Sequence, residues 1–315
     1  MHIKEIKLLA RDLLFFATGT ADVAPADLSV DEWLYPLDWT YQLDREKDYF
    51  EPKDSVGIPL LTFRGTLGDQ YLISRITGYA LAHWNRWRMT GDSLNREGFL
   101  RTVEHFPVAS AGRHAHNFPH AGMPTGWISC ISQGEAASVF ARAYVATGRR
   151  EHIERALEAI TPLTIPVDGG GLQSRLPDGR PFLEEYPGTI YRHVLNGCLY
   201  ALLGIHDVIR ASPEPKQEHQ LLFRALVDSV GQNLPAWDID GWSTYDYPFD
   251  TQPVRNANTM TYQVLQGTLL NYLGSVSGDK RLRAAGQRWL ANSRRLPFRL
   301  RALRDKLRYR FAFKW

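Results

Sequence analysis

The residues with the clearest capacity for chemistry lie in two short clusters that combine carboxylates with phenols. The first is Glu184-Glu185-Tyr186-Pro187, followed after seven residues by Leu195-Asn196-Gly197. The second is Ser243-Thr244-Tyr245-Asp246, and Tyr262 stands seventeen residues after Tyr245 at the start of an apolar helical pattern. Glu, Asp and Tyr act as general acids or bases once burial and neighbouring charges shift their pKa values. The clusters therefore suit an enzyme that moves a proton from and to carbon, although a single tyrosine on an apolar face is more often a core residue.

Helical periodicity dominates from about residue 70 onward, so the sequence predicts a mainly α protein. Three junctions have the same chemistry, in which a glycine ends one helix and a charged helix follows: Thr90-Gly91-Asp92, Thr147-Gly148-Arg149 and Ser277-Gly278-Asp279. Such repeated helix pairs predict an α/α toroid, that is, an incomplete α/α barrel, with a concave site formed by the loops at one end. Apolar residues recur at three-and-four spacing in eight segments: 71–90, 95–105, 128–147, 152–160, 191–209, 216–233, 261–276 and 280–293.

The chain divides into three predicted parts. Residues 1–65 read as an N-terminal helix and a proline-rich extended or irregular segment with short β structure, packed on the main domain. Residues 66–293 form the predicted toroid, and residues 294–315 form a basic amphipathic tail. Within the toroid, residues 163–190 are a non-helical island just before Glu185, and a loop of that length inside a helical domain is usually functional.

The basic tail carries most of the charge asymmetry. From Lys280 to Trp315 lie 13 of the 37 basic residues and one acid, Asp305, so this region is +12 and the rest of the chain is −9. Apolar residues recur between these charges at helical spacing: Leu300, Leu303, Leu307, Phe311 and Trp315. Such a tail is attracted to a polyanion or to an anionic membrane surface, or else it packs on its own protein as a solvated basic helix. No nucleic acid partner is expected, because no nucleic-acid-binding module is recognisable.

Composition and cysteine usage indicate an ordinary globular protein. With 315 residues, of which 44% are hydrophobic, the chain can bury a full core. Cys130 and Cys198 have no metal-ligand spacing, which argues against a disulfide framework and a zinc site. Arg11 and Asp12 interrupt the apolar run at 8–16, so we expect an amphipathic helix there and no signal peptide. The sequence therefore predicts a cytoplasmic protein, with peripheral membrane contact through the tail left open.

Several motifs, in order along the chain, resemble the C-terminal domain of the D-glucuronyl C5-epimerases, which convert D-glucuronate to L-iduronate within heparan sulfate or heparosan. The motifs are Gly57-Ile58-Pro59, Trp127-Ile128-Ser129 through Gln133-Gly134 to Arg142-Ala143-Tyr144, Glu184-Glu185-Tyr186-Pro187 with Leu195-Asn196-Gly197, and Leu234-Pro235 through to Tyr245-Asp246. The resemblance implies an α/α toroid, a groove for an anionic glucuronate-containing polysaccharide, and catalytic residues at Glu185, Tyr186, Tyr245 and Tyr262. No redox cofactor is needed by this chemistry.

Candidate substrate-binding residues surround these positions: Trp127, Gln133, Arg192, Asn196, Asp246 and Arg255. Arg192 or Arg255 can clamp a carboxylate through paired hydrogen bonds or stabilise a phenolate. Asp246 either accepts a sugar hydroxyl or caps the backbone beside Tyr245. Inversion at C5 needs two proton-transfer groups, for which we expect Tyr245 and Tyr262, with Glu185 as a base or as the group that orients a tyrosine.

The chain departs from the family pattern at two places. Tyr262-Gln263-Val264-Leu265-Gln266 stands where the family has Tyr-His-x-x-His, and Tyr247-Pro248-Phe249 stands where a basic residue is expected. The run from Arg113 to His120 contains three histidines, which either line the groove or bind a metal. No carboxylate that could complete a metal site lies near them in the sequence, so no metal is expected.

Three functions remain open from the sequence. The first is an epimerase acting on a glucuronate-containing polymer. The second is a uronate polysaccharide lyase, because elimination starts from the same carbanion. The third is a non-catalytic polyanion-binding protein, which the two missing histidines suggest. The oligomeric state, a homodimer included, is also left open.

Overall fold

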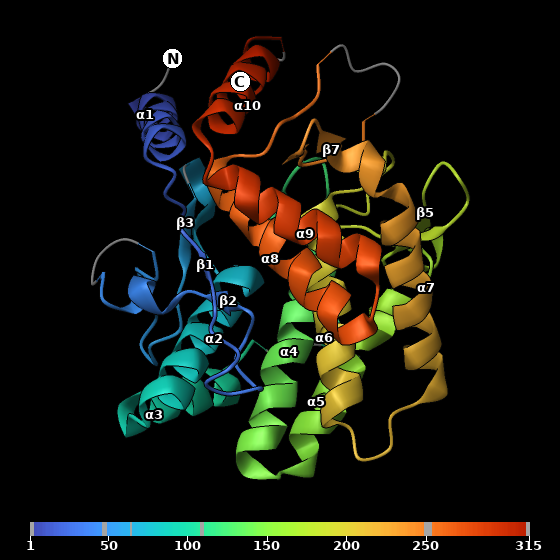
Figure 1. Ribbon diagram of the computed structural model, residues 1–315. Helices are drawn as coiled ribbons and strands as arrows, with labels where there is room; N and C mark the ends of the chain where they lie inside the picture. Colours follow the sequence, from blue (N-terminus) through green and yellow to red (C-terminus); the bar gives the residue numbers. More distant parts are fainter. Residues whose placement is uncertain (1–2, 46–48, 64, 108–109, 249–253, 313–315) are drawn as a thin grey trace.

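Four helix pairs make up most of the molecule in the computed structural model, which describes residues 3–45, 49–63, 65–107, 110–248 and 254–312 (Figure 1). Each of the eight helical segments expected from periodicity from residue 70 to residue 293 is present. The pairs are α2 (Ile73–Thr90) with α3 (Ser93–Glu104), α4 (Cys130–Thr147) with α5 (Arg150–Ile160), α6 (Leu195–Ala211) with α7 (Gln217–Asn233), and α8 (Met260–Ser277) with α9 (Lys280–Ser293).

The turns within three of these pairs use the expected glycines. Gly91, Gly148 and Gly278 end α2, α4 and α8 in the left-handed conformation, with φ of 75°, 68° and 76°. A residue without a Cβ adopts this conformation at little cost. The Asp92 and Asp279 side chains then accept hydrogen bonds from backbone N–H groups in the first turns of α3 and α9. Short glycine turns therefore fold three of the pairs back on themselves, and aspartate caps start the second helix in two of them.

Helices α2, α4, α6 and α8 form an inner layer, and most residues of α4 and α6 are buried. The backbones of α4 and α6 touch directly, because a Cβ added to Gly204 would lie 2.2 Å from the carbonyl oxygen of Gly134. Arg142 of α4 and Asp207 of α6 form an ion pair at 2.6 Å in which the side chains are 1% and 0% exposed. This close contact fixes the relative position of the two helices that carry most of the core.

The N-terminal segment joins the two ends of the inner layer. It contains α1 (Ile3–Thr18), the antiparallel strands β1 (Ala24–Pro25) and β2 (Leu37–Asp38), and the 3₁₀ turn η1 (Thr40–Leu43). The backbone N–H of Asp22 donates to Thr261 Oγ1 of α8 at 3.1 Å, and Asn85 of α2 accepts from the N–H of Tyr35 at 2.7 Å. The segment thus bridges α8 and α2.

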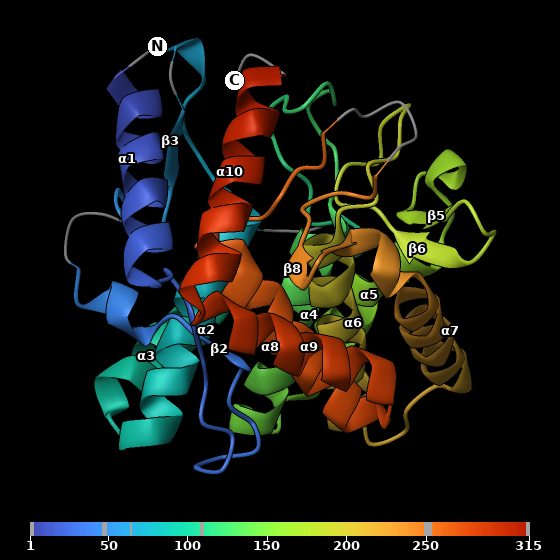
Figure 2. The same ribbon diagram turned by 45° about the horizontal axis from the view of Figure 1, so that its top comes forward.

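The long connections all lead into the N-terminal end of an inner helix. They carry short pieces of structure: η2 (Gly65–Leu67) within the hairpin of β3 (Leu61–Phe63) and β4 (Gly68–Gln70), η3 (Thr161–Thr164), η4 (Val167–Gly169), the hairpin of β5 (Gln173–Arg175) and β6 (Pro181–Leu183), η5 (Leu234–Trp237), and the hairpin of β7 (Asp238–Ile239) and β8 (Trp242–Ser243). Figure 2 brings this end of the molecule forward. Segments far apart in the sequence therefore meet above one end of the inner helices.

The basic tail forms helix α10 (Leu296–Ala312), which lies beside α1 (Figure 2). Arg310 of α10 forms an ion pair with the buried Asp12 of α1. Ala302 belongs to a small apolar cluster with Phe16 and Trp242, whereas Phe311 is 80% exposed. The tail is thus helical and packs on its own protein; Trp315, which was expected to continue its apolar face, lies outside the described residues. Among the described helices, none is long and apolar enough to span a bilayer.

Candidate active site

A cavity of about 880 Å³ lies at the N-terminal ends of the four inner helices. Ser74 of α2, Glu135 of α4, Asn196 of α6 and Tyr262 of α8 each contribute to its wall from the first two turns of their helix. The terminal helices α1 and α10 complete the wall. The aromatic residues that line the cavity are Trp39, Tyr49, Tyr186, Tyr200, Tyr245, Tyr262, Tyr309 and Phe311, and the basic residues are Arg11, Arg192, Lys306 and Arg310.

Glu185 lies directly behind the tyrosines of this cavity. The Tyr245 hydroxyl donates to Glu185 Oε1 at 3.2 Å, and the hydroxyls of Tyr245 and Tyr186 are 3.4 Å apart. Asn196 Nδ2 is 3.5 Å from the other carboxyl oxygen. A Cβ on Gly197 would lie 2.9 Å from the Cβ of Glu185, so a residue without a side chain is needed at that position of α6. Glu185 is not itself among the residues that line the cavity, and it communicates with the cavity through the Tyr245 phenol.

Burial sets the protonation of this group. It raises the pKa of Glu185 to about 7, although hydrogen bonds from Tyr186 and Tyr245 act in the opposite direction. Burial and the nearby Glu185 charge raise the pKa values of Tyr186, Tyr245 and Tyr262 above those of free phenols. The three phenols are therefore protonated at neutral pH, and Glu185 is the member of this cluster that changes charge near neutrality.

The neighbouring carboxylate, Glu184, faces away from the cavity. Ser174 Oγ donates to Glu184 Oε1 at 2.5 Å, and His193 Nδ1 is 2.6 Å from the same oxygen. The Glu184 side chain is fully buried. It therefore ties the β5–β6 hairpin to the loop before α6, and this attachment holds Glu185 at the cavity.

The two glutamines that replace the histidines of the family pattern position Tyr245. Gln263 Oε1 accepts from the backbone N–H of Ser243 at 2.8 Å and from its hydroxyl at 2.7 Å, while Gln263 Nε2 donates to the carbonyl of Trp289 at 3.0 Å. Gln266 Nε2 donates to the carbonyl of Thr244 at 3.4 Å. Both side chains are fully buried, and their hydrogen bonds fix the backbone at the two residues before Tyr245.

Tyr262 and Arg192 contact the Tyr245 ring from different elements. The rings of Tyr245 and Tyr262 are 5.5 Å apart at an angle of 84°, an edge-to-face contact. The Arg192 guanidinium lies 5.7 Å from the centre of the Tyr245 ring and donates to Asp246 Oδ2 at 2.5 Å. Asp246 is thus paired with Arg192, and Arg192 itself lines the cavity.

Four of the residues expected to bind substrate do not line the cavity: Trp127, Gln133, Asp246 and Arg255. Gln133 is fully buried; its amide donates to the carbonyls of Gly112 and Ala159, both at 2.7 Å, and accepts from the N–H of His114 at 2.7 Å. Arg255 is exposed and donates to the carbonyl of Asp238 at 3.0 Å. Neither lines the cavity, so the first supports a loop and the second lies on the outer surface. A buried amide that satisfies backbone groups and one that binds a sugar have the same sequence signal.

Trp127 and the histidines support the wall rather than forming most of it. The Trp127 ring stacks on Tyr186 at 6.1 Å and 29°, with its indole N–H donating to the carbonyl of Phe118. Burial lowers the pKa of His114 to about 3 and that of His116 to about 4, so both are neutral core residues. Of the run's three histidines, His120 lines the cavity. One of the three thus follows the groove-lining expectation.

Sequence reasoning missed Glu135 and Lys306. Glu135 lines the cavity from α4, accepts from Thr77 Oγ1 at 2.8 Å, and has a pKa raised by burial to about 8. Lys306 lines it from α10. Glu135 lies in a helix most of whose residues are buried, so the sequence shows no alternation between buried and exposed positions that would single it out. Lys306 lies in the basic tail, for which the sequence indicated external anions or packing on its own protein, but no position in a site.

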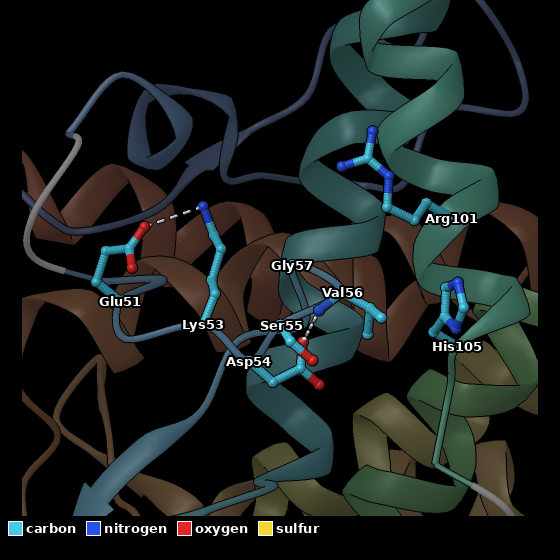
Figure 3. A pocket seen from close by; sticks show the side chains of 8 residues that line it. All are labelled: Glu51, Lys53, Asp54, Ser55, Val56, Gly57, Arg101 and His105. Carbon is cyan, nitrogen blue, oxygen red and sulfur yellow. Dashed lines mark hydrogen bonds and ion pairs between the residues drawn. The ribbon is translucent and has the colours of Figure 1, made fainter.

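A second hollow, of about 730 Å³, lies beside α3 and is lined by Lys53, Asp54, Arg101 and His105 (Figure 3). Lys53 pairs with Glu51 at 3.1 Å. Asp54 accepts from backbone N–H groups of its own turn, which contains Gly57. This hollow does not include the catalytic candidates, and both of its carboxylates have partners: Glu51 pairs with Lys53, and Asp54 accepts from its own turn and from the Tyr71 hydroxyl.

The helix pairs and the acid–base cluster at their N-terminal ends define an α/α toroid protein with a buried carboxylate–phenol site. The chain belongs to the family described as D-glucuronyl C5-epimerase C-terminus, whose family model matches residues 109–291. It is 30% identical over 181 residues to a D-glucuronyl C5-epimerase of Caenorhabditis elegans. The aligned region covers 53% of this chain and 29% of that protein. It is 28% identical over 137 residues to an uncharacterized protein of Methanocaldococcus jannaschii, covering 42% of this chain and 44% of that protein.

The chain thus spans less than half the length of these curated relatives. Among solved structures it is similar to cellobiose 2-epimerase from Bacillus thermoamylovorans, with a TM-score of 0.57, 10% identity, and coverage of 81% of this chain and 68% of that one. A glycoside hydrolase of family 105 from C. acetobutylicum gives a TM-score of 0.50 and 11% identity, covering 70% and 62%. At these identities the structural matches establish the fold alone, which is the α/α toroid expected from the repeated helix pairs. Helices α1 and α10 lie outside the residues matched by the family model.

Proposed function

We propose that this protein is an epimerase that inverts C5 of D-glucuronate to L-iduronate within a heparosan- or heparan-type polysaccharide. Membership of the D-glucuronyl C5-epimerase family supports the reaction. The observation that carries the proposal is the hydrogen bond from the cavity-lining Tyr245 hydroxyl to Glu185, at 3.2 Å. A carboxyl with a pKa of about 7 that contacts the cavity through a phenol is suited to proton transfer near neutral pH.

The proposed first step removes the C5 hydrogen as a proton. Tyr245 accepts it on its hydroxyl oxygen while the phenol's own proton passes to Glu185 Oε1, so that no free phenolate forms and Glu185 becomes neutral. The electron pair left on C5 spreads into the adjacent carboxylate and gives an enediolate. Arg192, beside the Tyr245 ring, adds positive charge on this side of the cavity.

The second step returns a proton to the other face of C5. Tyr262, which lines the cavity and contacts Tyr245 edge to face, donates its phenolic proton, and the enediolate becomes the inverted uronate. Solvent then restores the proton on Tyr262 and removes the one on Glu185. Because both protons exchange with water, each inversion in heavy water places deuterium at C5.

The test is NMR spectroscopy of heparosan, and of its N-sulfated form, incubated with the protein in D₂O. Deuterium at C5 together with iduronate signals is the expected result, and Tyr245→Phe should abolish both. An unsaturated uronate product would establish the lyase instead. Tight binding of either polymer without exchange would establish the non-catalytic polyanion-binding protein, and in both cases the epimerase proposal fails.

A further inference from the structure

The basic residues that line the cavity differ in their partners. Three of the four pair with a carboxylate: Arg11 with Asp22 at 3.5 Å, Arg192 with Asp246 at 2.5 Å, and Arg310 with the buried Asp12. Lys306 is the exception. Its ammonium donates to the amide oxygen Asn256 Oδ1 at 2.8 Å, and no carboxylate among the described residues lies within ion-pair distance of it.

This arrangement leaves the Lys306 ammonium without a directly bonded carboxylate at the cavity wall, and Asp12 and Asp246 act on it only from beyond ion-pair distance. An ammonium group has three N–H donors, and a neutral amide oxygen satisfies one of them. Removing a cation from water without an opposite charge is costly. Consistent with that cost, burial lowers the pKa of Lys306 from 10.5 to about 8, and the neighbouring Arg310 acts in the same direction. An anion that entered the cavity would supply the missing partner.

Lys306 is also attached to the segment that carries the proposed proton-transfer group. The backbone carbonyl of Asn256 accepts from the N–H of Tyr245 at 3.0 Å, so one residue holds both Lys306 and Tyr245. The wall thus offers a cation on the segment that holds Tyr245, which suits a sugar that carries a carboxylate.

We propose that Lys306 of α10 binds the carboxylate of the acidic sugar in the cavity through a salt bridge. The inference rests on the proposed function, and it assigns substrate recognition to a helix that lies outside the residues matched by the family model. Removal of the C5 proton moves negative charge onto the same carboxyl group. A fixed cation there stabilises the enediolate more than the bound substrate, so Lys306 contributes to binding and to the rate.

The experiment measures binding of a heparosan hexasaccharide and of the same hexasaccharide with its carboxyl groups reduced to alcohols. The proteins are the wild type, Lys306→Met, Lys306→Gln and the control Arg308→Met. Arg308 lies on the same helix, is 64% exposed and does not line the cavity. Lys306→Gln can keep a donor for Asn256 while it removes the charge. The wild type and the control should prefer the acidic form, and each neutral variant should lose about tenfold or more of its affinity for that form alone.

Outcomes that contradict the inference are distinct from those that contradict the epimerase. If the wild type exchanges C5 hydrogen and prefers the acidic form, but both neutral variants keep that preference, Lys306 does not bind the carboxylate and the proposed function stands. If the neutral variants weaken both oligosaccharides equally, Lys306 has a structural role, which also overturns the inference. If the wild type shows neither preference nor C5 exchange, the proposed function fails and the inference fails with it. Thermal unfolding of each variant confirms that the protein is folded.

Discussion

Replacement of Glu185 by glutamine separates the catalytic use of this carboxyl from its effect on stability. The side chain keeps its shape and an oxygen that can accept from Tyr245, but it loses the charge. Burial raises the pKa of Glu185 from 4.5 to about 7. At about 1.4 kcal/mol per pKa unit, this shift means that the buried carboxylate destabilises the folded state by about 3 kcal/mol when it is ionised.

The sign of the pH dependence follows from the two pKa values. Between pH 4.5 and about 7 the folded protein holds a proton on Glu185 that the unfolded chain releases. The stability contributed by the neutral carboxyl is therefore lost as the pH rises through this window, and above it the full cost remains. We expect Glu185→Gln to be more stable than the wild type by up to about 3 kcal/mol at pH 8 and nearly equal to it at pH 4.5. Chemical denaturation at the two pH values measures this difference.

Activity should change in the opposite direction. C5 exchange by the wild type should rise through pH 7, because the ionised carboxylate is the proton acceptor, and the glutamine variant should be slower by about 10²- to 10⁴-fold. Glu154→Gln, at an exposed side chain, is the control and should match the wild type in both measurements. A Glu185→Gln protein that is less stable at pH 8, or that exchanges C5 hydrogen at a similar rate, would refute the reasoning.

Three further predictions test the site and the core. Tyr245→Phe should abolish deuterium uptake at C5, and Tyr262→Phe should abolish iduronate formation, while each variant keeps polymer binding within a few-fold; loss of binding would remove the residue from proton transfer. Gln263→Leu leaves a buried N–H and a buried carbonyl unpaired and should lower the free energy of unfolding by about 3 kcal/mol, with loss of exchange; a fully active, equally stable variant would show that the amide does not position Tyr245. Arg142→Met should lower the free energy of unfolding by about 3–5 kcal/mol, because it leaves Asp207 buried without its partner. In denaturation experiments the double variant Arg142→Met with Asp207→Leu should recover much of that loss; no recovery would show that the ion pair itself is strongly stabilising.

The helix pairs were predictable because their signals are local. Glycine in the left-handed conformation followed by an aspartate cap, as at Gly91-Asp92 and Gly278-Asp279, is determined by a few neighbouring residues. The junction between α6 and α7 was harder to recognise as the same turn, because Ser212 and a proline-containing segment replace the glycine. Periodicity nevertheless located both helices, since their buried faces are long.

The site was predictable only in part, because its members are brought together by tertiary contacts. Glu185, Tyr186 and Tyr245 meet as expected from their chemistry, and Tyr262 joins them at the first turn of α8. Gln133 was also expected to bind substrate, yet its three hydrogen bonds go to backbone groups. A sequence does not distinguish a polar side chain that satisfies a buried loop from one that faces a cavity.

The tail illustrates a second limit. Its basic and apolar residues at helical spacing suit a membrane surface, an external polyanion or a protein surface equally well. The deciding contact is the pair between Arg310 and Asp12, whose positions are 298 residues apart. No local pattern reveals that partner.

The pairing of the first and last helices has a consequence for the order in which the molecule assembles and opens. Contacts between such distant positions close a very long loop, so they form after the helix pairs, whose contacts are local. The cavity therefore acquires its last wall late in folding, when α10 reaches α1. We also expect this wall to open before the rest of the structure, because, among the side chains that the structure describes, fewer buried apolar residues hold it. If the ligand is the polysaccharide proposed above, opening of this wall would let the chain enter from the side without being threaded by its end.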